Sequence, residues 1–251
     1  MRNSPLNIGF LESAGLTKLF NEAASYLRGI SIEMVSCKRG QRNGEKHPAT
    51  VIGLTAWSPT ILIADSLEKG EKIEAIAHEL SHLVLVYRFG LRVIGRRISP
   101  PRTGEEVFGY SLSMNKDWGY LLGQVANTVH HLILIDYLKE EYGIESGLYR
   151  RLLHHNFCII ANDNDRDKES LYVRGLIAFE YEKLLGKIGR AINPYLQPEF
   201  FWKAYHLAQK YFGRYGFRSM PTLSSYQENI LSFLEALGYQ REDFVFFPER
   251  K

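Results

Sequence analysis

One apolar segment constrains the fold most. It predicts a buried helix that nevertheless carries polar side chains. Residues 72–89 are rich in Ile, Leu and Val and are followed by Gly90. Among them stand His78, Glu79 and His82. Two imidazoles and a carboxylate are costly to bury in an apolar helix unless a partner satisfies them. The segment therefore predicts a buried helix with a polar partner beside it.

The spacing of these three residues indicates a metal ion as that partner. Each helical residue advances by about 100°, so His78 and His82 stand one turn apart and can bind one ion together. Glu79 is offset by one residue and can reach a metal-bound water as its general base. We expect Zn²⁺ as the cofactor, because zinc in such sites polarises a carbonyl and acidifies its water. The competing interpretation is a chance occurrence of H-E-x-x-H.

A catalytic zinc site needs a third protein ligand, and the sequence leaves its identity open. The third and sixth residues after His82 are Leu85 and Arg88, so a third ligand from the same helix is excluded. Glu105 and Glu106 lie about two dozen residues further on and form one candidate pair. Glu106 also fits a capping box at a helix start, which would give it a structural role instead.

A second set of candidate ligands lies on the helix predicted over 118–142, which is apolar nearly all round. Adjacent residues on a helix point about 100° apart, so at most one of His130 and His131 can face the ion. His131 ranks first, because Asn127 one turn earlier could orient it. His130 ranks second and Asp136 third. The predicted metal ligands are thus His78 and His82 with His131 added.

The rest of the chain predicts an α+β fold, because strands come early and helices late. Strands are expected at 30–37, 50–56 and 60–64, the last two as a strand pair that can form a hairpin. Further helices are expected at 14–28, 166–188, 199–213 and 224–237. With 251 residues, a single domain is expected, made of a core at 1–143 and a helical extension at 144–251. A small N-terminal sheet should pack on the motif helix.

Charge and cysteine content narrow the possible partners and compartment. The net charge of +3 is too small to indicate nucleic acid as the main partner. Only Cys37 and Cys158 are present, without metal-ligand spacing, and no long apolar run predicts a signal or a membrane span. We expect a cytoplasmic protein with a peptide or protein substrate, no nucleic-acid or membrane partner, and an oligomeric state that remains open.

Over about residues 50–140 the chain resembles the zincin metallopeptidases, and more loosely the gluzincin-like members of the ImmA/IrrE type. The resemblance is carried by the strand pair at 50–64, the run Ile73 to His82 and the later helix with candidate ligands. It implies a peptidase in which His78 and His82 bind zinc and Glu79 is the base. It also implies that a strand edge beside the motif helix holds an extended substrate.

Several roles stay open at this level. The group that stabilises the oxyanion could be His130, Tyr110 or Tyr137. The pair His154 and His155 favours a structural role, because adjacent side chains on a helix diverge. The alternative function, from another class, is a regulatory protein-binding module on a zincin scaffold with a structural metal or none.

Overall fold

The computed structural model divides the chain into two compact units. Unit 1 comprises residues 1–90 and 134–149, and unit 2 comprises residues 91–133 and 150–251. The structure describes residues 4–5, 8–35, 49–54, 56–96, 116–162, 167–186 and 197–247. Helix α4 (Lys116–Tyr142) runs without interruption through the boundary at 133/134, so its first part belongs to unit 2 and its last turns to unit 1.

Unit 1 contains a mixed sheet of four short strands. They are β1 (Ser4–Pro5), β2 (Ser31–Val35), β3 (Ala49–Ile52) and β4 (Thr60–Ala64), in the order β1-β2-β4-β3. β3 and β4 form the expected antiparallel hairpin, while β2 runs parallel to β4. Ile61 and Ile63 of the central strand β4 are completely buried, which anchors the sheet in the core of this unit.

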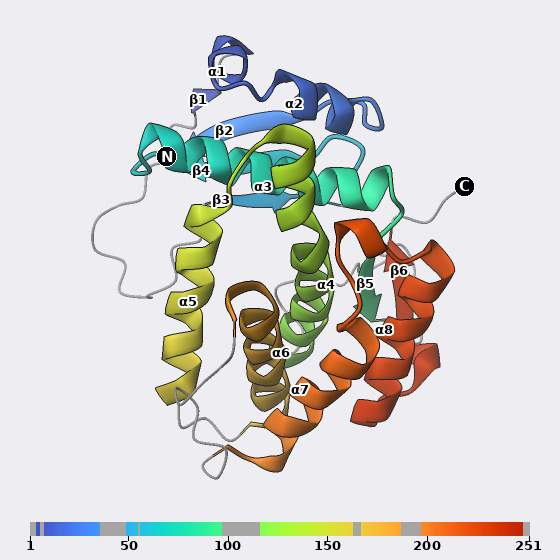
Figure 1. Cartoon of the computed structure of the whole chain (residues 1–251). Helices are drawn as coiled ribbons and strands as arrows, with labels where there is room; N and C mark the ends of the chain where they lie inside the picture. Colours follow the sequence, from blue (N-terminus) through green and yellow to red (C-terminus); the bar gives the residue numbers. More distant parts are fainter. Residues whose placement is uncertain are drawn as a thin grey trace. The chain divides into compact units, whose positions relative to one another are not determined.

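The helices of unit 1 pack on this sheet and on one another. They are α1 (Ile8–Ser13), α2 (Thr17–Ala24) and α3 (Lys69–Tyr87), joined by the end of α4. α3 contacts β3, β4 and α2, and Figure 1 shows it running alongside the strands. A capping box formed by Glu68 and Glu71 begins α3 and satisfies its first backbone N–H groups.

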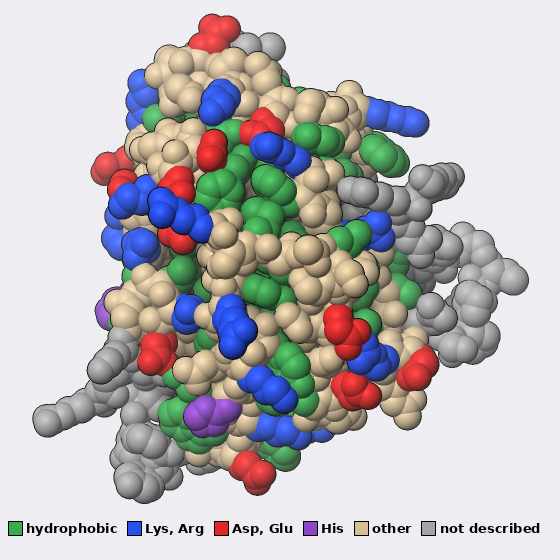
Figure 2. Space-filling view, turned by 45° about the vertical axis from the view of Figure 1, so that its right-hand side comes forward, with side chains coloured by type: hydrophobic (Ala, Val, Ile, Leu, Met, Phe, Trp, Pro, Cys, Tyr) green, Lys and Arg blue, Asp and Glu red, His purple; other side chains and the backbone are tan. Residues whose placement is uncertain are grey.

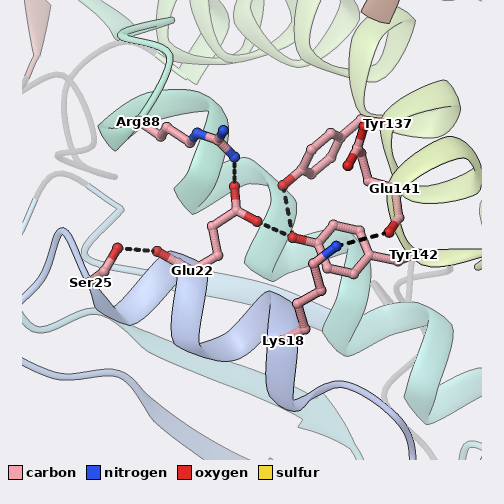
Figure 3. A network of polar contacts seen from close by, with 7 residues as sticks. All are labelled: Lys18, Glu22, Ser25, Arg88, Tyr137, Glu141 and Tyr142. Atoms are coloured by element: carbon pink, nitrogen blue, oxygen red, sulfur yellow. Dashed lines mark hydrogen bonds and ion pairs between the residues drawn. The ribbon is translucent and has the colours of Figure 1, made fainter.

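A polar network centred on Glu22 joins three helices of unit 1 (Figure 3). The Glu22 carboxylate of α2 accepts hydrogen bonds from Arg88, which follows α3, and from Tyr142 at the end of α4. The Tyr142 hydroxyl lies 3.2 Å from that of Tyr137. The Lys18 ammonium stands 4.8 Å from the centre of the Tyr142 ring. These contacts hold the ends of α3 and α4 against α2.

Unit 2 is mainly helical. It contains α5 (Gly147–Asn162) from Arg150 onward, α6 (Lys168–Leu185), α7 (Glu199–Phe212), α8 (Leu223–Leu237), the 3-10 turns η2 (Phe217–Ser219) and η3 (Arg241–Asp243), and the antiparallel strands β5 (Val93–Arg96) and β6 (Phe244–Phe247). α7 packs against both α6 and α8. Asp167 and Thr222 cap the starts of α6 and α8 by accepting backbone hydrogen bonds.

The crossing of α6 and α7 is unusually close at one position. A Cβ atom added at Gly175 of α6 would lie 2.4 Å from the Phe201 carbonyl oxygen and 3.0 Å from the Ala204 Cβ of α7. The absence of a side chain at Gly175 is what lets the two helix backbones approach. Glycine is therefore required here for packing and not for backbone conformation.

The α+β class expected from the sequence is confirmed, and strand β4 matches its predicted range. Every predicted helix has a counterpart, although the helix expected at 14–28 is shorter in the structure, as α2 spans only Thr17–Ala24. Helices α1 and α5, strand β1 and the β5–β6 pair were not predicted. None of the described helices is apolar over enough residues to cross a bilayer. The predicted division at 143/144 stays a prediction.

Charged side chains of both signs are interspersed on the described part of the face in Figure 2. Lys and Arg lie next to Asp and Glu there, with hydrophobic side chains between them. This mixture agrees with the near balance of 31 basic against 28 acidic residues.

Candidate metal centre

His78 and His82 lie one above the other on α3, as the four-residue spacing predicts. Their Nε2 atoms are 3.2 Å apart, and the two rings meet edge to face with centres 4.9 Å apart. Two nitrogen ligands of one tetrahedral zinc ion stand about 3.3 Å apart, given zinc–nitrogen bonds of about 2.0–2.1 Å. The pair is therefore spaced as two ligands of a single ion would be, with His82 buried.

Glu79 follows His78 on α3 and lies beside strand β3. Burial raises the pKa of the Glu79 carboxyl to about 8, and a hydrogen bond from the Val51 backbone opposes that shift. A raised pKa makes the carboxylate form of Glu79 a stronger base, which suits a group that must accept a proton during a reaction. Its contact with Val51 fixes it next to the outer strand of the sheet.

One face of the His78 imidazole is covered by an aromatic ring. Tyr149 stacks on the His78 imidazole with ring centres 5.0 Å apart and an angle of 24° between the planes. The start of α5 is held there because the Glu74 carboxylate of α3 accepts a hydrogen bond of 2.6 Å from the Leu148 N–H. Tyr149 is not recognisable as part of the site from the sequence, because its helix was not predicted.

His131 is oriented by a buried carboxylate from α6. Its Nδ1 lies 2.8 Å from Glu180 Oε1, and Glu180 is only 1% exposed. The Thr128 hydroxyl donates to Glu180 Oε2 over 2.9 Å, and the Gln124 amide lies 3.3 Å from the same oxygen. With Nδ1–H donated to the carboxylate, Nε2 of His131 presents its lone pair as a metal ligand.

The ligand nitrogens of His78, His82 and His131 all lie within 4.8 Å of one another. Among the described residues this three-histidine cluster is the one group of three or more His, Cys, Asp or Glu that could hold a metal ion. His131 stands three residues before Leu134, where the continuous helix α4 enters unit 1. Three imidazole nitrogens, one of them on a ring backed by a carboxylate, form a donor set that suits zinc and other borderline metals.

The other candidate ligands are placed elsewhere or lie outside the described residues. His130 is directed to the Leu91 carbonyl oxygen, 2.8 Å from its Nε2, and burial lowers its pKa to about 4. Asp136 is exposed. Glu105 and Glu106 lie outside the described residues.

The reason given for ranking His131 first is wrong. Asn127 is exposed, so it does not orient the imidazole; Thr128 and Glu180 occupy that environment instead. Glu180 is the functional candidate that sequence reasoning missed. The available signal was a carboxylate that directly follows the buried apolar run Leu176 to Phe179.

Two of the proposed oxyanion-stabilising groups have other roles. His130 Nε2–H donates a hydrogen bond to the Leu91 carbonyl oxygen, and the Tyr137 hydroxyl contacts Tyr142 in the Glu22 network. Tyr110 lies outside the described residues.

Compared with known proteins, the chain matches no family model, no curated protein and no solved structure. Its function therefore has to be inferred from its own residues.

Proposed function

We propose that this protein is a zinc-dependent hydrolase, most specifically a metallopeptidase of the zincin type. The observation that carries the proposal is the three-histidine cluster with Glu79 in sequence between two of its members. A purely structural metal site has no need of such a carboxylate, because its ion is enclosed by ligands. Three ligands leave the fourth position of a tetrahedral ion for water or substrate.

The surroundings of the cluster support a zincin-like arrangement. The motif helix α3 packs on a small sheet that includes the hairpin of β3 and β4, as the resemblance implies. β3 stands at the end of the sheet, so its outer edge pairs with no other described strand. An extended peptide can add to such an edge by backbone hydrogen bonds. Glu79 contacts Val51 of this strand and would thus lie beside a bound peptide.

The chain's own residues can supply the proton transfers of peptide hydrolysis. A bound zinc ion would supply Lewis acidity, polarising the scissile carbonyl and making water more acidic. Glu79 accepts the proton that the attacking water loses and then delivers it to the leaving nitrogen as the C–N bond breaks. Glu180 stabilises the orientation of His131 throughout, because its carboxylate accepts from Nδ1.

The decisive experiment compares wild type with Glu79→Gln. Both proteins should carry about one zinc per three-histidine cluster, because Glu79 is not a ligand. Cleavage of a complex peptide mixture, followed by mass spectrometry of new termini, should fall by about 100-fold or more in the variant, as loss of a general base predicts. Glu140→Gln, an exposed change on α4, is the control.

Two results would contradict the peptidase proposal. The first is a zinc-loaded wild type that generates no new termini in any peptide of the mixture. The second is cleavage that Glu79→Gln leaves unchanged. The first result would favour the alternative function, a regulatory protein-binding module whose metal is structural, and the second would exclude Glu79 as the general base.

A further inference from the structure

A second pair of potential metal ligands lies on the exposed face of α5, within unit 2. His154 and Cys158 are four residues apart and therefore stand one turn above the other. The Cys158 Sγ and the His154 Nε2 are 3.8 Å apart, and both side chains are exposed. His154 thus pairs with Cys158 and not with its neighbour His155, which agrees with the expected divergence of adjacent side chains.

The imidazole of this pair is held in place from behind. His154 Nδ1 lies 3.1 Å from the Tyr181 hydroxyl of α6. The Tyr181 ring stacks on Phe157 with centres 4.0 Å apart and an angle of 14°, and Phe157 is buried. A core contact therefore fixes Tyr181, and Tyr181 in turn engages Nδ1. An oriented imidazole with its second nitrogen hydrogen-bonded is the usual arrangement of a histidine that binds metal.

The spacing of the pair fits a tetrahedral ion. Zinc–sulfur bonds of about 2.3 Å and zinc–nitrogen bonds of about 2.0–2.1 Å place the two ligand atoms about 3.6 Å apart at a tetrahedral angle. The observed separation of 3.8 Å between the two ligand atoms is slightly longer, and a small rotation of either side chain would remove the difference. We propose that His154 and Cys158 form a second metal-binding site, which takes a borderline ion such as Zn²⁺ or Co²⁺.

Ion binding here would convert the Cys158 thiol to a thiolate and release its proton to solvent. Water would complete the coordination, because both ligands lie at the surface. The site needs no residue of the three-histidine cluster and is independent of the proposed hydrolase function. The competing explanation is a simple hydrogen bond between thiol and imidazole, which would bind no metal.

Cobalt titration of the full-length protein separates these two explanations. Co²⁺ bound to a thiolate absorbs in the near ultraviolet through sulfur-to-metal charge transfer, whereas an all-histidine site does not. The band should form in wild type and in His78→Ala. It should be absent in Cys158→Ser, and half-saturation in His154→Ala should need at least about tenfold more cobalt, as expected for loss of one of two ligands.

His155→Ala is the matched control, since it removes an exposed neighbouring imidazole and should leave the titration unchanged. Cys37→Ser should also retain the band. The proposal is overturned if wild type shows no charge-transfer band, if the band survives Cys158→Ser, or if His154→Ala titrates like wild type. Persistence of the band in His78→Ala keeps this result separate from any failure of the three-histidine cluster.

Discussion

Glu180 is the residue whose charge most directly affects the candidate metal centre. Its carboxylate is buried and receives hydrogen bonds from His131 and Thr128, so it holds one imidazole in a single orientation and tautomer. A negative charge at this position also favours binding of a cation by the imidazole.

Glu180→Gln should therefore weaken zinc binding while leaving the protein folded. Glutamine can still accept from His131, but the charge is lost, and we expect a decrease in zinc affinity of about 10- to 100-fold. Competition with a chromophoric chelator measures this affinity, and circular dichroism checks the fold. The surface variant Glu140→Gln should bind zinc like wild type. Equal affinities in wild type and Glu180→Gln would refute a contribution of the Glu180 charge to zinc binding.

The pKa of the Glu22 carboxyl predicts how the stability of the protein depends on pH. Burial raises the pKa of its carboxyl, but hydrogen bonds from Tyr142, Arg88 and Tyr137 outweigh that effect and bring the pKa below its ordinary value of 4.5. Because the pKa is lowered in the folded state, the Glu22 carboxylate stabilises the protein fully above about pH 4.5. This contribution is lost as the pH falls further, through the lowered pKa of the folded state.

Glu22→Gln should consequently unfold at a lower temperature than wild type at neutral pH, with a loss of about 1–2 kcal/mol in the free energy of unfolding. The difference should shrink as the pH is lowered below 4.5, because wild type then loses the same charge. Melting temperatures measured from pH 7 to pH 3 test this, with the exposed Glu12→Gln as control. A difference that stays constant over this range would contradict the assignment.

At the residue scale, what could be predicted depended on distance along the chain. His78, Glu79 and His82 follow from helical periodicity alone, because one helix places all three. His131 was the first choice among several, but the reason given for it failed, because Glu180 reaches it from 49 residues away. Such a contact is set by helix packing, which a single sequence does not reveal.

Among the elements, the crossing of α6 and α7 gives a sharp prediction for Gly175→Ala. Alanine favours helices over glycine by about 1 kcal/mol, but its Cβ would lie 2.4 Å from the Phe201 carbonyl oxygen. Because the obstacle is backbone, the helices must separate, and we expect a net loss of about 1–3 kcal/mol in the free energy of unfolding.

Gly123→Ala on α4 is the matched control, because a Cβ added there meets no atom within 4 Å. It should leave stability unchanged or raise it by up to about 1 kcal/mol. Urea unfolding of both variants gives the comparison. The packing explanation fails if Gly175→Ala is as stable as Gly123→Ala.

Elements with strong local signals were predicted, and elements that depend on distant partners were not. α3 and α8 show clear apolar periodicity and end before Gly90 and Gly238 respectively. β5 and β6 are four residues each, and their partners lie about 150 positions apart in the chain, so neither segment identifies itself. α5 carries Arg151, His154 and His155 on its exposed side and Leu153 and Phe157 on its buried side, and this pattern was not recognised as a helix.

For the whole molecule, metal binding should add to stability. The three-histidine cluster draws on two helices distant in sequence, so unfolding separates its members and abolishes high-affinity binding. Zinc at about 100 times its dissociation constant should then add about 2.7 kcal/mol to the free energy of unfolding. For a chain of this size that corresponds to a rise in melting temperature of about 5–10 °C.

The measurement is a thermal scan with zinc and with chelator, performed on Cys158→Ser so that the proposed second site does not contribute. His82→Ala in the same background should lose the zinc-dependent rise. A rise that persists in His82→Ala would mean that the stabilising ion binds elsewhere.

At this scale the sequence predicted the α+β class but not the two compact units, because α4 contributes to both of them.

The short length of β3 limits what this protein could recognise. A strand of four residues spans about 13 Å, so a substrate added along its edge would be read over no more than about four consecutive positions. Recognition that brief leaves most of a protein substrate without contact to the strand. Selectivity among cellular proteins would then depend on where a short, locally unfolded segment happens to be accessible, and less on an extended consensus sequence.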